Sequence, residues 1–211
     1  MRDMTQRNLS EAYAGESQAY MKYTAWADKA ESEGRPNTAR LFRAVAAAEK
    51  VHAVNHWKVL GNVLDTASNL QHALDGERHE IDEMYPAFEA VAELQQEKAA
   101  LRTMHWALET EKVHAKKYER ALEAAKASKD VELGQLHVCP VCGYTMEGEA
   151  PDACPVCGAK RERFAKFGTR RGGCALATLD PDAGYACKTA LRLYAPHMHS
   201  EVPISCPAAL P

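Results

Sequence analysis

The sequence predicts an all-α four-helix bundle that is followed by a small Cys₄ metal-binding module and an irregular C-terminal tail. Three observations support this fold class. Good helix formers dominate the chain up to about residue 127. The motif Glu-x-x-His occurs twice, at Glu49–His52 and Glu111–His114. Two Cys-x-x-Cys pairs follow the helical part, at Cys139/Cys142 and Cys154/Cys157.

Composition excludes several other classes of protein. The net charge of −3 argues against a general binder of nucleic acid or anionic membranes. No stretch approaches the roughly 20 apolar residues of a membrane-spanning helix, and the N-terminus lacks the apolar core of a secretory signal. We therefore expect a cytoplasmic protein without a membrane or nucleic-acid partner.

Three sequence breaks divide the helical part. They fall at Gly34-Arg35-Pro36, near Gly61-Asn62 and around Leu94-Gln95. Because the connections are short, we expect an antiparallel up-and-down bundle over residues 1–127, in which Pro86 kinks or divides the third helix. The predicted helices span residues 5–33, 37–61, 65–93 and 96–127.

Each predicted helix places carboxylates on the same face as apolar and aromatic residues. At steps of three or four residues, Glu16 shares a face with tyrosines, and Glu80 and Glu83 share a face on the third helix. Buried, unpaired carboxylates cost several kcal/mol or shift their pKa values upward. Two bound cations would relieve the mutual repulsion. The predicted metal ligands, which are also the predicted catalytic residues, are Glu16, Glu49, His52, Glu80, Glu83, Glu111 and His114.

One Glu-x-x-His motif alone is common on solvated helices, but two copies beside inward glutamates favour a di-metal site of the type known from helical bundles. The other helix histidines, His56, His72, His79 and His105, are interpreted as surface or satisfied residues. Tyr20, Tyr23 and Tyr85 are interpreted as core residues, with hydrogen bonding to ligand carboxylates as the alternative.

The two CPVCG segments are metal knuckles. Each Cys-x-x-Cys turn presents two sulfurs, and two turns complete a tetrahedral site from Cys139, Cys142, Cys154 and Cys157. Zinc and iron both use such sites, and zinc would make the module purely structural. The neighbouring redox site, together with Tyr144, favours iron. We place this module at residues 137–167, after a polar linker at 128–136.

These motifs together resemble a rubrerythrin, a ferritin-like di-iron domain joined to a rubredoxin-like domain. The resemblance covers residues 4–167. It depends on AGESQAY, AAEKVHA, GERHEIDEMYP, ETEKVHAKKYERAL and the two CPVCG knuckles.

The resemblance also implies roles for the predicted ligands. Glu49 and Glu111 would bridge two irons, and Glu16 would bind the first iron with Glu83 and His52 alternating as its other ligand. Glu80 and His114 would hold the second iron, with a third iron, or zinc, in the Cys₄ site.

The family implies a peroxidase that reduces hydrogen peroxide to water in oxidative-stress protection. Its electrons come from NAD(P)H through a rubredoxin reductase or rubredoxin and enter at the Cys₄ iron. The usual homodimer, with one subunit's rubredoxin-like domain beside the other's di-iron site, implies electron transfer between subunits.

Alternatives stay open at this stage. A ferritin-like ferroxidase would not need a Cys₄ electron inlet, a zinc-stabilised interaction protein would lack redox activity, and an oxygenase would need an apolar substrate channel. The loop between the knuckles is short for a rubredoxin. The segment 168–211 matches no pattern of the family and is expected to be disordered, and its Cys174, Cys187 and Cys206 lack knuckle spacing.

Overall fold

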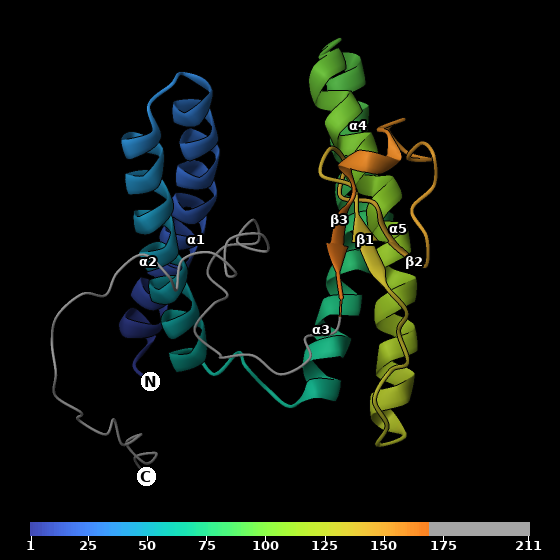
Figure 1. Ribbon diagram of the computed structural model, residues 1–211. Coiled ribbons are helices and arrows are strands. Elements are labelled where there is room, and N and C mark those ends of the chain that lie inside the picture. The colour runs from blue at the N-terminus through green and yellow to red at the C-terminus, as the bar shows by residue number, and fades with distance from the viewer. Residues whose placement is uncertain (169–211) are drawn as a thin grey trace, which may run out of the picture. The chain divides into compact units, whose positions relative to one another are not determined.

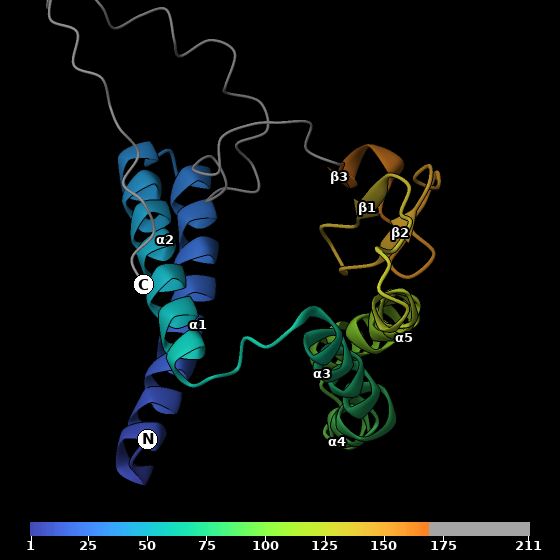
Figure 2. The same cartoon turned by 90° about the horizontal axis from the view of Figure 1, so that it is seen from below.

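The computed structural model describes residues 1–168, so the predicted disorder of the tail lies outside the described residues. The first helical hairpin consists of α1 (Asp3–Ser32) and α2 (Pro36–Val59), which lie side by side in both views (Figures 1 and 2). Alanines form the seam between them, because the buried residues are Ala27, Ala30, Ala39, Ala46 and Ala53. Small residues let two helices approach closely, but this seam buries little apolar area.

The second hairpin begins with α3 (Thr66–His79), a π-helical turn, η1 (Glu80–Met84), and α4 (Tyr85–Leu94), and it returns through α5 (Lys98–Lys126). Its buried side chains are Leu74, Ala92, Leu108, Thr110 and Leu122. All four predicted helical spans agree with the structure to within two residues at each end. Pro86 lies in the first turn of α4, directly after η1, so the predicted division of the third helix is confirmed.

The three turns between the helical segments are short. Gly34 and Gly61 adopt positive φ angles of 71° and 79°, which end α1 and α2 at glycines that carry no Cβ penalty. Asp65 caps α3 by accepting hydrogen bonds from the backbone N–H and the hydroxyl of Ser68. Helix α5 follows a turn at Gln95–Glu97, where Gln96 also has a positive φ.

The Cys₄ module contains an antiparallel sheet in the order β2-β1-β3, formed by Leu136–Val138 (β1), Thr145–Glu147 (β2) and Ala165–Phe167 (β3). A 3₁₀ turn, η2 (Arg161–Arg163), precedes β3. The core of the Cys₄ module is formed by Cys139, Ala150, Cys154 and Phe164, so two metal-binding sulfurs lie in the core itself. A module this small has too little hydrophobic core to be stable alone, and a bound metal ion supplies the missing stabilisation.

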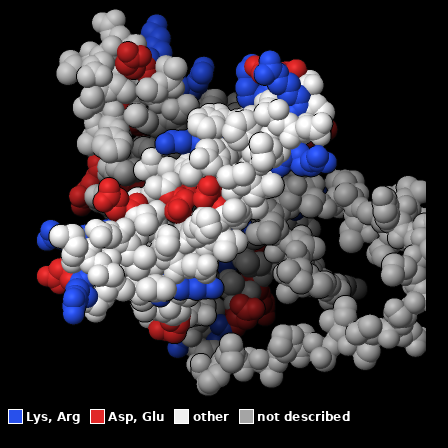
Figure 3. Space-filling model, turned by 90° about the vertical axis from the view of Figure 1, so that its left-hand side faces the viewer, with Lys and Arg blue, Asp and Glu red and all other residues white. Residues whose placement is uncertain are grey.

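Charged side chains of both signs are interspersed with uncharged ones on the face shown in Figure 3. This mixture agrees with the small net charge. Among the described residues, no helix is both long and apolar enough to cross a membrane.

Candidate metal centres

The first hairpin brings three predicted ligands together. The side chains of Glu16, Glu49 and His52 place ligand atoms within 4.8 Å of one another. His52 Nδ1 lies 3.0 Å from Glu49 Oε2 and 3.8 Å from Glu16 Oε1. The i, i+3 spacing on α2 aims the carboxylate and the imidazole at one point, and Glu16 reaches the same point from α1. The side chain of His52 remains 54% exposed, so one side of this cluster is open.

The second hairpin forms a matching cluster, but with a residue that sequence reasoning missed. Its members are Glu77, Glu111 and His114, again with ligand atoms within 4.8 Å of one another. His114 Nδ1 lies 2.6 Å from Glu111 Oε2 and 3.9 Å from Glu77 Oε1. Glu77 lies in the GERHE segment, one helical turn before Glu80.

On the third helix, the structure brings a different glutamate into the cluster from the two that the sequence pattern predicts. The predicted face carries Glu80 and Glu83, whereas Leu74 and Glu77 define the face toward α5. The π-helical turn at Glu80–Met84 then shifts the register, which a uniform 3.6-residue period cannot anticipate. The carboxylate of Glu83 is 76% exposed and lies 3.5 Å from His79, so the structure does not bring it to either cluster.

Glu80 lies close to the second cluster without belonging to it. It is not one of the three clustered ligands, but burial and then the negative charge of Glu111 raise its pKa. Tyr85 and Tyr118 also face this region, since burial and the nearby carboxylates raise the pKa of both phenols. Tyr85 therefore lies within electrostatic range of Glu80 and Glu111, and its hydrogen bonding to a ligand carboxylate stays a prediction.

The carboxylates of the second cluster oppose one another's ionisation, a cost that bound cations would remove. Burial, followed by the adjacent Glu111, raises the pKa of Glu77 to about 7. Burial opposes ionisation of Glu111 as well, but hydrogen bonds from His114 and Glu77 lower its pKa. The hydrogen bond to Glu111 raises the pKa of His114, although burial opposes this shift. A divalent cation would replace the shared protons with coordinate bonds.

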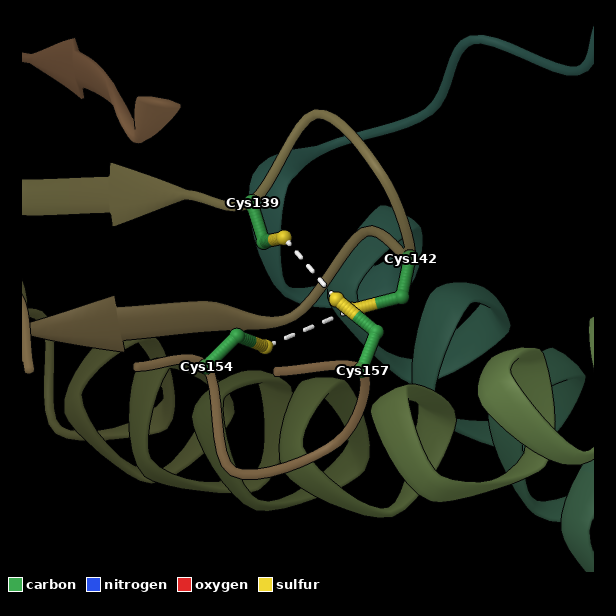
Figure 4. A group of neighbouring side chains, drawn as sticks. All are labelled: Cys139, Cys142, Cys154 and Cys157. Atoms are coloured by element: carbon green, nitrogen blue, oxygen red, sulfur yellow. Dashed lines mark hydrogen bonds between the residues drawn. The ribbon is translucent and has the colours of Figure 1, made fainter. Parts of the chain in front are cut away.

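The four cysteine sulfurs converge as the knuckle spacing predicts. All four Sγ atoms lie within 4.8 Å of one another (Figure 4). The sulfurs of Cys139 and Cys157 are 3.5 Å apart, and those of Cys142 and Cys154 are 3.6 Å apart. A tetrahedron with metal–sulfur bonds of about 2.3 Å has sulfurs about 3.8 Å apart, so the site fits a thiolate-bound metal.

Burial and backbone hydrogen bonds shift the pKa values of these thiols in opposite directions. Burial raises the pKa of Cys142 and Cys157. Burial also opposes ionisation of Cys139, but N–H groups of Val141 and Cys142 donate hydrogen bonds to its sulfur and lower its pKa. A thiolate that accepts backbone hydrogen bonds is a suitable ligand for a redox-active iron.

The Cys₄ module is hydrogen-bonded to the second cluster. His114 Nε2 lies 3.0 Å from the hydroxyl of Thr145 on β2. The Thr145 hydroxyl donates to the carbonyl of Gly143, the residue after Cys142, over 2.9 Å. Arg120 on α5 donates to Glu147 on β2 as a second connection. An apolar cavity of about 300 Å³ lies between these elements and reaches His114 and Thr145.

Two carboxylate–imidazole clusters on helices, with a Cys₄ module bonded to one of them, define a non-haem di-metal redox protein. The family model for rubrerythrin matches residues 7–122, and that for the rubrerythrin rubredoxin-like domain matches residues 137–165. The chain belongs to the rubrerythrin family. Its helical region is the ferritin-like domain, and its cofactors are a di-iron site with carboxylate and histidine ligands and a metal in the rubredoxin-like Cys₄ site.

Two relatives with similar sequences support this assignment. Rubrerythrin-2 of Clostridium acetobutylicum is 44% identical over 178 residues, which cover 78% of this chain and 97% of the relative. Nigerythrin of Nitratidesulfovibrio vulgaris is 33% identical and covers 77% of this chain and 86% of the relative. The structure of fully reduced, all-ferrous nigerythrin aligns with a TM-score of 0.46 at 33% identity, over 77% of this chain and 86% of the other. Rubrerythrins are di-iron oxidoreductases associated with oxidative stress, and the rubredoxin-like domain implies electron transfer with rubredoxin-type partners.

Proposed function

We propose that the protein is a peroxidase that reduces hydrogen peroxide to water at its di-iron site with electrons delivered through the Cys₄ iron. The hydrogen-bonded contact between the Cys₄ module and His114 supports this function most directly. A ferroxidase that stores or buffers iron does not need an electron inlet beside its di-iron ligands. The observation therefore favours a reductase over an iron-handling protein.

The overall reaction consumes one peroxide, two electrons and two protons and yields two waters. The di-iron site, when loaded, supplies the two electrons one from each ferrous ion, so that the O–O bond is cleaved without release of a radical. Each cluster contributes two carboxylates and one imidazole, which is a hard donor set suited to iron in both oxidation states.

Within this proposal, six residues hold the iron pair: Glu16, Glu49 and His52 from the first hairpin and Glu77, Glu111 and His114 from the second. Glu80 is the seventh ligand candidate in place of Glu83, because it is half-buried and close enough to Glu111 and His114 for their charges to shift its pKa. We assign to Glu80 and the exposed His52 the alternation that accompanies oxidation, since ferric iron favours a carboxylate and ferrous iron an imidazole. Because the pKa of Glu77 is raised, protons compete with iron for this carboxylate as the pH falls.

The electron donor in this proposal is NAD(P)H, acting through a rubredoxin reductase or rubredoxin, and the protein is a homodimer. The family resemblance implies that each rubredoxin-like domain serves the partner subunit's di-iron site. The contact between Thr145 and His114 lies within one chain, and it supplies an additional route into the second cluster.

Anaerobic stopped-flow spectroscopy of the fully reduced protein tests the function. We expect hydrogen peroxide to reoxidise the Cys₄ iron rapidly, with consumption of two electrons per peroxide and formation of water. Rapid reoxidation by dioxygen with iron mineral formation, and a weak response to peroxide, would instead identify a ferroxidase. Zinc in the knuckles and no response to peroxide would contradict the redox function altogether.

A further inference from the structure

The connections between the helical segments are too short for one chain to close a ferritin-like bundle by itself. Such bundles contain one long crossover, which carries the chain from one end of the bundle to the other. Here α1 and α2 are joined by three residues, Glu33–Arg35, and α4 and α5 by three, Gln95–Glu97. Only the connection between α2 and α3 remains as a candidate.

That connection is also short and is held at both ends. Helix α2 ends at Val59 and α3 begins at Thr66, so six residues join them. The N–H of Asn62 returns to the carbonyl of Trp57 at the end of α2, and Asp65 caps α3 through Ser68. Seven Cα–Cα steps between Val59 and Thr66 span at most about 25 Å, whereas the 24 residues of α2 are about 36 Å long. The chain cannot cross the bundle within this connection.

Each hairpin nevertheless carries half of the di-iron ligand set. The first supplies a glutamate and a Glu-x-x-His pair, and the second supplies the same combination in the same order. The helix–helix contacts of the described residues are those within each hairpin. Both hairpins also leave apolar side chains uncovered, among them Val45, one turn before Glu49, and Phe88 and Val91 on α4. Each hairpin is thus a half-site that needs the other kind of hairpin.

We propose that two copies of this chain exchange their first hairpins, so that Glu16, Glu49 and His52 of one subunit complete the di-iron site with Glu77, Glu111 and His114 of the other. A second copy supplies the missing hairpin without a crossover, because the short connection then only has to pass between two neighbouring bundles. Alanine packing within the first hairpin leaves its larger side chains free for this contact. The inference uses the ligand assignment of the proposed function but does not depend on peroxidase activity.

A consequence concerns electron delivery. Because Thr145 is bonded to His114 within one chain, the Cys₄ module of that chain adjoins a site to which both subunits contribute ligands. The expected communication between subunits would then arise from the construction of the site itself.

Co-expression of two full-length variants with different affinity tags tests the exchange. One variant carries Glu49→Ala and the other Glu111→Ala, and the heterodimer is isolated through both tags in succession. With exchanged hairpins, one site of the heterodimer contains both substitutions and the other contains neither. We therefore expect the heterodimer to bind about half of the di-iron complement of the wild type, measured by metal analysis beside the Cys₄ iron.

If each chain closes its own bundle, both sites of the heterodimer are damaged and the iron pair is lost, which overturns the proposal. The matched control pairs Glu49→Ala with Glu16→Ala, both on the first hairpin, and should give no intact site. The pairing of Glu49→Gln with Glu111→Gln, which preserves side-chain size, guards against misfolding. A monomeric wild type with a full iron complement, seen by light scattering, would also overturn the exchange. Because the readouts are iron content and molar mass, a protein without peroxidase turnover can still confirm it.

Discussion

The imidazole Nε2 of His114 and the hydroxyl oxygen of Thr145 lie 3.0 Å apart and join helix α5 to strand β2. The Thr145 hydroxyl already donates its proton to the carbonyl of Gly143, so its oxygen accepts from the Nε2–H of His114. With the proton held on Nε2, the Nδ1 atom, which lies on the side of Glu111 and Glu77, can offer its lone pair to a metal ion bound between them. The Cys₄ module thereby fixes the tautomer of an iron ligand, in the way that outer hydrogen bonds orient ligating histidines.

Replacement of Thr145 should weaken this centre. We expect Thr145→Val to lower the iron affinity of the second cluster by roughly 10- to 100-fold, the range seen when partners of ligating histidines are removed. Chelator competition followed at equilibrium measures the affinity. Thr145→Ser keeps the hydroxyl and should restore wild-type binding. Equal affinities for the valine and serine variants would show that the hydroxyl has no positioning role.

The proposed ligand assignment makes Glu77 an iron ligand and leaves Glu83, six residues later on the third helix, outside the site. We expect Glu77→Gln to reduce di-iron loading strongly, because an amide cannot replace a carboxylate that neutralises the cations. The matched control Glu83→Gln should load normally, since the Glu83 side chain is 76% exposed and pairs with His79. Metal analysis of both purified variants distinguishes them. Loss of iron from the Glu83→Gln variant instead would show that Glu83, and not Glu77, is the ligand on the third helix.

Much of the fold could be predicted from the sequence because its signals are local. Gly34, Gly61 and Pro36 mark helix ends through backbone conformations that few residues share, and the knuckle spacing Cys-x-x-Cys determines the sulfur geometry directly. The Glu-x-x-His pairs likewise require only a helix. These features depend on residues within one turn of each other.

The features that could not be predicted depend on geometry over a longer range of the chain. The π-helical turn after His79 changes the register of the third helix, so a regular period selected Glu83 and missed Glu77. Thr145 carries no motif and becomes part of the site only because β2 lies against α5. The short α2–α3 connection was visible in the sequence, but its conflict with a crossover topology emerged only with the exact ends of α2 and α3.

The Cys₄ module can be uncoupled from the di-iron site by one substitution. We expect Cys142→Ser to leave the di-iron site loaded but to reduce NAD(P)H-coupled peroxide turnover to background, because the thiolate site loses a ligand next to Gly143. Cys174→Ser, outside both knuckles, is the control. The coupled rate and the visible spectrum of the Cys₄ iron are measured together. Full coupled turnover in the Cys142 variant would remove the module from the electron path.

Asp65 holds the start of α3 beside the short connection, and its contribution should depend on pH. Hydrogen bonds from the hydroxyl and the backbone N–H of Ser68 lower the pKa of Asp65 below its usual value. A depressed carboxyl pKa stabilises the folded state above the unfolded pKa, and this stabilisation is lost as the pH falls through the folded pKa. We therefore expect Asp65→Ala to lower the melting temperature of the metal-free protein at pH 7.

The difference in melting temperature between wild type and Asp65→Ala should shrink as the pH is lowered toward the range in which Asp65 becomes protonated. Thermal unfolding followed by circular dichroism at a series of pH values measures it. Asp65→Asn separates the two contributions, because asparagine also caps helices but carries no charge. It should retain much of the stability at neutral pH and show a weaker pH dependence. A constant difference between wild type and the alanine variant at all pH values would mean that the charge of Asp65 contributes nothing to the cap.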